Sequence, residues 1–463
     1  MKTKIKSYIE INKDNMLKDL AELIAIPSIS EDLEQVAEGM NWVLSKAEEL
    51  GFEATSVLDG QVGVVEILPE GLSEEECECL GILTHVDVVP ADDEEEWHTN
   101  PFEAVIKDEK IFGRGTLDDK GMIIASLYAM KACKELGLPF KKKVQLIIGT
   151  QEEVDWTDME AYVKEYRLPD YGFTPDGEYP ICNIEKGVMD VTMEFYVKES
   201  CRGTGKEAKC SLEAPEIEQI ICGTAKNTVP GKAVAKLSDG ENVVANGKSV
   251  HSSDPERGKN ALFVLYDKLI QLQEQGKLQG NKTLSVLGSV VGVFRSIFGE
   301  KLGLYNETEY YKGEFVHRNV FSVTIFNADS EKVEVNVNVR FPYGQSEEEI
   351  VNKFEEFTSD NHGKITYVSS LPAVFVSKES PFLKVLAEAY EDVTGLDNEF
   401  TIAYGGSYAK AMPNVVSWGP IFVGKEDTCH EPNEYISVKD LLANTEIFAN
   451  SIAGIVFSEE SFR

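Results

Sequence analysis

The sequence predicts an α/β protein in which an α/β domain with a mostly parallel sheet is interrupted by an inserted α+β domain. Apolar runs of strand length alternate with helical patterns through the first part of the chain, as βα units require. From about Gly187 this alternation gives way to longer strand patterns, and from about residue 373 it returns. We therefore expect one domain from residues 1–186 and 373–463, and a second from residues 187–372.

Length, composition and charge limit the classes of protein that fit. The chain has 463 residues, too many for one ordinary core, with 42% hydrophobic and 27% charged residues. Its net charge of −35 argues against binding to nucleic acids or anionic membranes, which need basic patches. The polar start lacks a signal peptide, no window reaches the roughly 18 apolar residues of a membrane span, and the eight cysteines lack zinc-knuckle spacing. We expect a cytoplasmic protein with free thiols.

The first part of the chain reads as alternating helices and strands. A helix is expected up to Ile24, and a second is expected to close at Gly51, where a glycine commonly ends a helix. Apolar runs then predict strands over residues 62–68, 80–84, 110–112 and 144–148, a short strand ending near Thr174, and a helix over residues 121–136.

The inserted part has a different pattern. Residues 199–226 are irregular and polar, and a helix is expected over residues 260–272. Four valines, at 333, 335, 337 and 339, alternate with polar residues, which predicts a half-buried antiparallel strand with Arg340 on its polar face. Beyond it, Ser380-Pro381 predicts the start of a helix that closes near Gly395, residues 415–418 read as a strand, and His430 precedes a terminal helix.

Acidic residues or a histidine follow four of the predicted strands. His85 and Asp87 end the strand over residues 80–84 and, two positions apart in an extended chain, point the same way. Taken alone, this pair also fits a strand end with a surface histidine. The other strand ends lead to Asp118, to the Glu152-Glu153 pair and to Asp176, and parallel strands bring such ends to one edge of the sheet. Together they favour a dinuclear site for zinc or manganese bridged by Asp118.

These motifs together resemble the zinc-dependent exopeptidase family of bacterial dipeptidases, carnosinases, aminoacylases and diaminopimelate desuccinylases, from about residue 15 to the C-terminus. The chain looks most like the peptidase V type of dipeptidase. This similarity rests on Gly-Arg-Gly-x-x-Asp-Asp-Lys-Gly at residues 113–121, on Thr174-Pro175-Asp176 and on an insertion near 185 residues long. In that branch the long insertion is a lid that leaves the protein a monomer, and the peptide bond after Asp118 is cis.

The resemblance implies a role for each of eight residues. His85 and Asp176 would hold one zinc ion, Glu153 and His430 the second, and Asp118 would bridge the two. Asp87 would orient His85, Glu152 would be the general acid and base, and His251 of the inserted lid would reach the substrate carbonyl. The ions would be two Zn²⁺ per chain, with Mn²⁺ or Co²⁺ as alternatives.

Further residues would bind the free carboxylate of a small dipeptide. The resemblance points to Asn227 and Arg340 in the inserted domain and to Lys410, where many relatives carry an arginine. The implied reaction is hydrolysis of a dipeptide by a metal-bound hydroxide, with closure of the lid. Two alternatives stay open: a deacylase of N-acyl amino acids, which an assay with acylated substrates separates, and an inactive binding homologue, which would have lost a ligand or the base.

Overall fold

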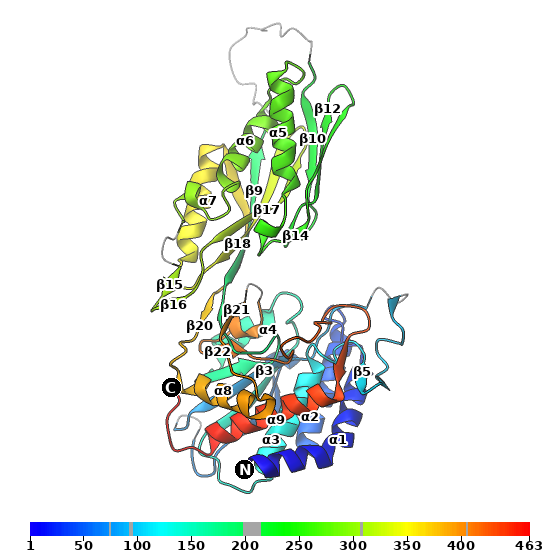
Figure 1. Ribbon diagram of the computed structural model, residues 1–463, viewed down its shortest axis with the longest axis vertical. Helices are drawn as coiled ribbons and strands as arrows, with labels where there is room; N and C mark the ends of the chain where they lie inside the picture. Colours follow the sequence, from blue (N-terminus) through cyan, green and yellow to red (C-terminus); the bar gives the residue numbers. More distant parts are fainter. Residues whose placement is uncertain (74–75, 92–95, 198–213, 306–308, 404–405) are drawn as a thin grey trace. The chain divides into compact units, whose positions relative to one another are not determined.

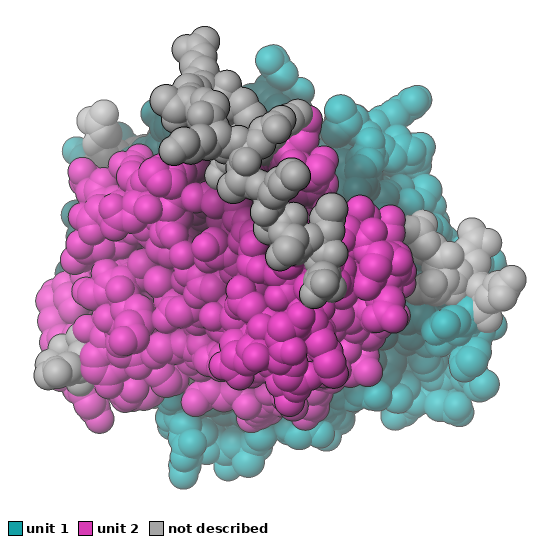
Figure 2. Space-filling model, turned by 90° about the horizontal axis from the view of Figure 1, so that it is seen from above, with its two compact units in different colours: residues 1–184, 374–403, 407–463 teal, residues 185–373, 404–406 magenta. Residues whose placement is uncertain are grey.

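The computed structural model describes residues 1–73, 76–91, 96–197, 214–305, 309–403 and 406–463 (Figure 1). The chain divides into two compact units, coloured separately in Figure 2. The larger unit comprises Met1–Ile184, Val374–Ala403 and Ser407–Arg463, and the smaller consists mainly of Glu185–Ala373. The domain limits expected from the sequence, 186/187 and 372/373, lie within two residues of these boundaries.

The larger unit is an α/β structure. Its helices are α1 (Lys2–Ile24), α2 (Leu33–Glu49), α3 (Lys120–Lys134), α4 (Thr157–Glu165), α8 (Pro381–Thr394) and α9 (Val438–Val456). The strands of its main sheet are β1 (Glu53–Val57), β2 (Val62–Ile67), β3 (Cys79–His85), β6 (Lys143–Gly149), β7 (Tyr171–Thr174), β8 (Cys182–Glu185), β20 (Val374–Phe375), β21 (Thr401–Ala403) and β22 (Val415–Ser417).

The main sheet is parallel in its centre. Its order is β1-β2-β6-β3-β7-β22-β8-β20, with β21 beside β8. Strands β6, β3, β7 and β22 pair in parallel, whereas β1, β2 and β8 add antiparallel pairs on either side. All seven residues of β3 are buried, as expected for an inner parallel strand covered on both faces. The predicted α/β class with a mainly parallel sheet is confirmed.

Helix α3 is the internal helix of this unit. Its residues from Lys120 to Met130 are all buried, and it packs on strand β3 and on helices α1 and α9 (Figure 1). A helix that is apolar all round must be enclosed in this way. The buried side chain of Lys120 donates to the carbonyl oxygens of Leu23 at 3.2 Å and Ile26 at 2.6 Å.

One predicted strand belongs to a different sheet. Strand β5 (Lys110–Phe112) pairs with β4 (Val105–Lys107) and β23 (Tyr435–Ser437) in a small antiparallel sheet, not with the main sheet. The expectation that this strand leads Asp118 to the main sheet edge was therefore wrong. Asp118 reaches that edge because it lies next to Asp119, the N-cap residue of α3, which packs against β3.

The smaller unit is an α+β structure. Its helices are α5 (Ala261–Glu274), α6 (Lys282–Phe294) and α7 (Glu347–Asp360). A seven-stranded antiparallel sheet contains, in order, β13 (Asn242–Asn246), β12 (Lys232–Leu237), β10 (Ile217–Cys222), β17 (Val320–Ala328), β18 (Lys332–Phe341), β9 (Gly187–Tyr196) and β19 (Gly363–Leu371). Two-stranded pieces are formed by β11 (Thr228–Val229) with β14 (Val250–His251) and by β15 (Tyr310–Tyr311) with β16 (Glu314–Phe315).

The three helices of the smaller unit cover one face of its sheet (Figure 1). The four alternating valines of β18 enter the core on this face, as the sequence predicts. The polar face was expected to be exposed, yet Asn336, Asn338 and Arg340 on that face are 1%, 1% and 5% exposed. Hydrogen bonds satisfy the two asparagines there, so this polar face of β18 is buried and does not face solvent.

Strand β10 was missed by the sequence pattern, which reads residues 199–226 as irregular. Residues 199–213 of that stretch lie outside the described part. In β10 the pairing with β12 shifts register between Ile217 and Gln219, and the buried residues are Ile217, Ile220 and Cys222. This bulge interrupts the two-residue alternation by which strands are recognised.

A truncation in the main sheet tests the assignment of its core. Ile147→Ala in β6 removes a side chain that is 0% exposed and should lower the free energy of unfolding by about 2–5 kcal/mol. Ile106→Ala in β4, where the side chain is 53% exposed, should change it by less than about 0.5 kcal/mol. Calorimetry of both variants checks this, and equal transitions for the two would contradict the assignment.

Candidate metal centre

The site lies at the carboxyl ends of three central strands and is completed by the loop before α3 and the loop before β23. His85 is the last residue of β3, and the loops after β6 and β7 carry Glu153 and Asp176. Asp118 lies directly before α3, and the Asp118-Asp119 peptide bond is cis, as the resemblance implies. Gly121 lets this turn close, because a Cβ atom there would lie 2.1 Å from the carbonyl oxygen of Thr116.

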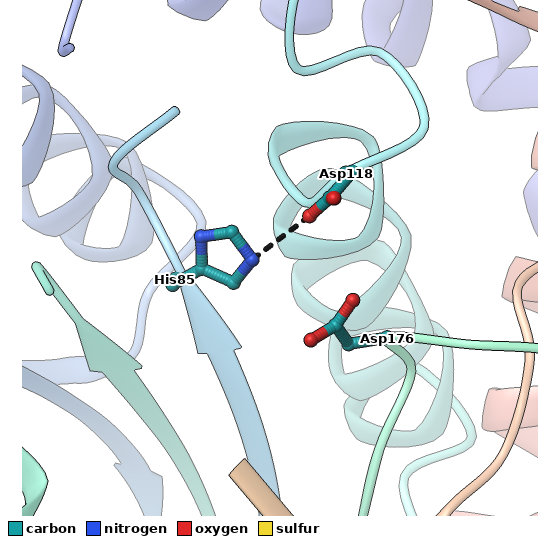
Figure 3. Close-up of side chains that lie close together, drawn as sticks. All are labelled: His85, Asp118 and Asp176. Carbon is teal, nitrogen blue, oxygen red and sulfur yellow. Dashed lines mark hydrogen bonds and ion pairs between the residues drawn. The ribbon is translucent and has the colours of Figure 1, made fainter. Parts of the chain in front are cut away.

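Two groups of possible ligands share Asp118. The first joins His85, Asp118 and Asp176, and the second joins Asp118, Glu153 and His430; within each group the ligand atoms lie within 4.8 Å of one another. Figure 3 shows the first group, with the carboxyl groups of Asp118 and Asp176 one above the other, both on the same side of the His85 ring. The structure thus brings together all five residues expected to bind metal, in the two sets expected from the resemblance.

The two oxygens of Asp118 face different histidines. Its Oδ1 lies 3.0 Å from Nε2 of His85, and its Oδ2 lies 3.0 Å from Nε2 of His430. Nε2 of His430 also lies 3.0 Å from Oε2 of Glu153. Because each oxygen of Asp118 faces a different group of possible ligands, its carboxylate has the arrangement of a ligand that bridges two ions.

The pKa values reflect this crowding of charges. Hydrogen bonds with Asp118 and Glu153 raise the pKa of His430 to about 10. Burial lowers the pKa of His85, but its bonds with Asp118 and Asp87 outweigh that effect and leave the pKa well above its usual value. Burial raises the pKa of Asp118, yet the two histidines hold it well below the ordinary range. The acids and imidazoles therefore stabilise one another's charged forms.

Asp87 supports two parts of the site. Nδ1 of His85 lies 3.0 Å from the backbone oxygen of Asp87 and 3.4 Å from its carboxylate Oδ1. The same carboxylate accepts the backbone N–H groups of Glu152 and Glu153, each at 3.3 Å, and the hydroxyl of Ser30 at 2.8 Å. Asp87 thus holds the imidazole ring and the Glu152-Glu153 turn in a fixed relation.

Glu152 lies beside the two groups without belonging to either. Burial raises the pKa of its carboxyl well above the usual value, and the charges of Asp176 and Glu153 raise it further. A carboxyl in this setting readily accepts and returns a proton. Its neighbour Glu153 has a raised pKa for the same leading reason, burial.

The residues expected to contact substrate lie in both units. In the smaller unit, the pairing of β11 with β14 brings Asn227 and His251 together. The backbone N–H of Ser252 donates to the backbone oxygen of Asn227 at 2.8 Å. Nε of Arg340 donates to Asn338 at 3.0 Å, and Asn338 also accepts the hydroxyl of Ser252. Lys410 lies in the larger unit, in a short 3₁₀ helix, and is 4% exposed.

Two contributors to the site were not singled out from the sequence. Ser30, which donates to Asp87, carries no motif around it. Glu434 accepts hydrogen bonds from the Asp118 loop, and its position four residues after His430 was the available signal. Their contacts join residues 57 and 316 positions apart in the chain, which sequence spacing does not reveal.

Comparisons with known proteins identify the family of this chain. The model of "Peptidase family M20/M25/M40" matches residues 81–453. A Staphylococcus saprophyticus protein named "Putative dipeptidase" is 33% identical over 496 residues, covering 98% of this chain and 99% of that protein. A Bacillus subtilis protein of the same name is 32% identical over 469 residues, covering 95% and 97%.

Solved structures show the same fold. An aminoacylhistidine dipeptidase from Vibrio alginolyticus aligns with a TM-score of 0.65 at 14% identity, covering 95% of this chain and 96% of that one. The dipeptidase Dug1p from Saccharomyces cerevisiae aligns with a TM-score of 0.60 at 14% identity, covering 99% of each chain. In the described residues, no helix has the length and apolar character needed to span a membrane. The family model and the full-length relatives confirm the resemblance: the chain belongs to peptidase family M20/M25/M40 and is a hydrolase of peptide bonds.

Proposed function

We propose that this chain is a dinuclear-zinc dipeptidase that cleaves the peptide bond of small dipeptides. The observation that carries the proposal is the sharing of Asp118 between two ligand groups, with one oxygen toward each histidine. Relatives of nearly the same length that are named as dipeptidases support the substrate class.

The donor set fits divalent metal ions. Each group offers one imidazole nitrogen and carboxylate oxygens, which suit zinc and also manganese or cobalt. His85, Asp118 and Asp176 would hold one ion, and Asp118, Glu153 and His430 the other. When bound, such a pair of ions polarises a peptide carbonyl and lowers the pKa of a water molecule.

Glu152 is the proposed general base and acid. It would take a proton from water onto its carboxylate and later give that proton to the nitrogen of the leaving amine. Its backbone is fixed by the bond from its N–H to Asp87, and its pKa is raised chiefly by burial. These two features support a role in proton transfer rather than in metal binding.

The smaller unit would supply recognition of the substrate. Arg340 is buried and always charged near neutral pH, so it suits a free carboxylate, which a guanidinium can bind through two parallel hydrogen bonds. Partial burial and the charge of Arg340 lower the pKa of His251, so its neutral ring would donate a hydrogen bond to the substrate carbonyl. Asn227 and Lys410 are the remaining candidates for polar contacts.

An N-acyl amino acid deacylase is the alternative within the same family. Turnover of free dipeptides against N-acylated amino acids, measured on protein of known metal content, tests the proposal directly. Preference for the acylated compounds would favour the deacylase. An inactive binding homologue would lack a ligand or the base, and His85, Asp118, Glu152, Glu153, Asp176 and His430 are all present.

Removal of the proposed base should separate catalysis from metal binding. Glu152→Ala should abolish turnover of dipeptides and leave two metal ions bound, because Glu152 lies outside both ligand groups. Initial rates and elemental analysis measure the two properties. Turnover within about tenfold of the wild type, equivalent to about 1.4 kcal/mol, would remove Glu152 from this role.

Removal of a proposed ligand, unlike removal of the proposed base, should lower the metal content. Glu153→Ala and His430→Ala each take away a donor of the second group and should lower the metal content below two ions per chain. Glu152→Ala, which removes the adjacent carboxylate, is the matched control. Two ions per chain at full occupancy in either variant would exclude that residue as a ligand.

The proposed binding of the substrate carboxylate can be tested at Arg340. Arg340→Ala should raise KM and lower kcat/KM for dipeptides. The loss of transition-state stabilisation should be about 2–4 kcal/mol, because a buried charged partner of the substrate is lost. A dipeptide amidated at its C-terminus lacks the partner charge and should be affected far less. Both substrates measured on both proteins form a double cycle. Equal losses would show that Arg340 is structural, leaving Lys410 as the next candidate.

A further inference from the structure

The carboxylate of Glu434 lies next to the metal centre without belonging to either ligand group, and it is 0% exposed. Its Oε1 accepts the backbone N–H of Leu117 at 2.8 Å and that of Asp118 at 3.2 Å. Its Oε2 accepts the N–H of Gly115 at 3.0 Å and Nη1 of Arg114 at 2.9 Å. One buried side chain thus takes four hydrogen bonds from a single five-residue stretch.

That stretch needs an external acceptor. Residues 113–118 form neither helix nor strand, so their buried N–H groups have no partners in regular secondary structure. Gly115 has a φ of +87°, a conformation that residues with a side chain rarely adopt, and this allows successive N–H groups to turn toward one point. The backbone oxygen of Glu434 adds a fifth bond by accepting the N–H of Gly113 at 3.0 Å.

Arg114 extends the same contacts to two more loops. Its Nη2 donates to the backbone oxygens of Pro90 at 3.3 Å and His430 at 3.4 Å. Its guanidinium also lies over the ring of Trp97, 5.3 Å from the centroid. The Arg114–Glu434 ion pair therefore connects the loop after β3, the Asp118 loop and the His430 loop, which carry ligands of both groups.

We propose that Glu434 is a positioning residue that holds the Asp118 carboxylate between His85 and His430 and so sets the affinity for both metal ions. The inference rests on the proposed dinuclear function. Since Asp118 is common to both groups, a shift of its backbone would weaken both ions together, whereas loss of a ligand such as Glu153 would weaken one. A neighbour that holds a ligand in this way commonly changes metal affinity by 10- to 100-fold.

The variant Glu434→Gln keeps the size of the side chain and changes its hydrogen bonding. An amide has one acceptor oxygen, so its NH₂ group would face two donors and Arg114 would lose its counter-charge. We expect the affinity for both Zn²⁺ and Co²⁺ to fall by at least about tenfold. Isothermal titration with each metal measures this, and the visible absorption of bound Co²⁺ should change because its ligand geometry changes.

Asp170→Asn is the matched control. The Asp170 carboxylate also anchors backbone, accepting the N–H of Cys79 at 2.9 Å at the opposite end of β3, and it binds Nε of Arg463 at 2.8 Å. This variant should lose thermal stability while keeping the metal affinity and the Co²⁺ spectrum of the wild type. Wild-type affinity in Glu434→Gln, or a loss that Asp170→Asn reproduces at equal melting temperature, would overturn the proposal.

A further variant keeps the test decisive if Glu434→Gln does not fold. Arg114→Lys leaves Glu434 its three backbone donors but removes the guanidinium that reaches Pro90 and His430. It should therefore show a smaller fall in affinity for both ions than Glu434→Gln. Unchanged affinity in that variant would then overturn the proposal. The wild-type titration stands apart: if the unaltered chain binds fewer than two ions, the dinuclear function itself fails, whatever the variants show.

Discussion

The structure of this peptidase depends on keeping many carboxylates together at one edge of a sheet. Asp118 stands between His85 and His430, and Asp87, Asp119, Glu152, Glu153 and Asp176 crowd around the same edge. Like charges repel, and burial disfavours the charged form of an acid. Burial accordingly raises the pKa of Glu152, Glu153 and Asp119. Two imidazoles offset part of this repulsion, and the proposed pair of divalent ions would offset the rest.

The scaffold of the larger unit is organised to hold that arrangement. Strand β3 lies between β6 and β7 in parallel, so three consecutive strand ends deliver their loops to one edge. The side chain of Asp87 binds the backbone of the next loop, and Glu434 and Arg114 bind the loops beyond it. The backbone around Asp118, Glu153 and His430 is therefore held by side chains from other loops. Such mutual support is the ordinary means of keeping a metal site in shape before the ion binds.

The smaller unit keeps a cation buried on its sheet. Arg340 lies on a polar sheet face whose asparagines are satisfied by hydrogen bonds, and its Nε donates to Asn338. Burial lowers the pKa of Arg340 to about 10 and that of Lys186 to about 7, with Arg340 itself contributing to the effect on Lys186. Cations gathered in this way favour an anionic partner, in agreement with the proposed reading of a substrate carboxylate.

The sequence determined the elements with strong local signals. The buried run of β3, the helix over residues 120–134 and the alternating valines of β18 follow from periodicity, and the ordered motifs identified the family. The resemblance that those motifs support also named the five residues that form the two groups of possible ligands.

Only the tertiary structure decided the features made by contacts between distant segments. Strand β5 joined a separate sheet, in which it pairs with the neighbouring β4 and with Tyr435–Ser437, more than 300 residues away. The bulge in β10 hid its alternation, and the polar face of β18 became buried through bonds with β9 and with Ser252, which follows β14. Glu434 came to hold Asp118 across 316 residues. Local patterns report which face of an element is apolar, whereas burial of polar groups depends on partners that the chain supplies only when folded.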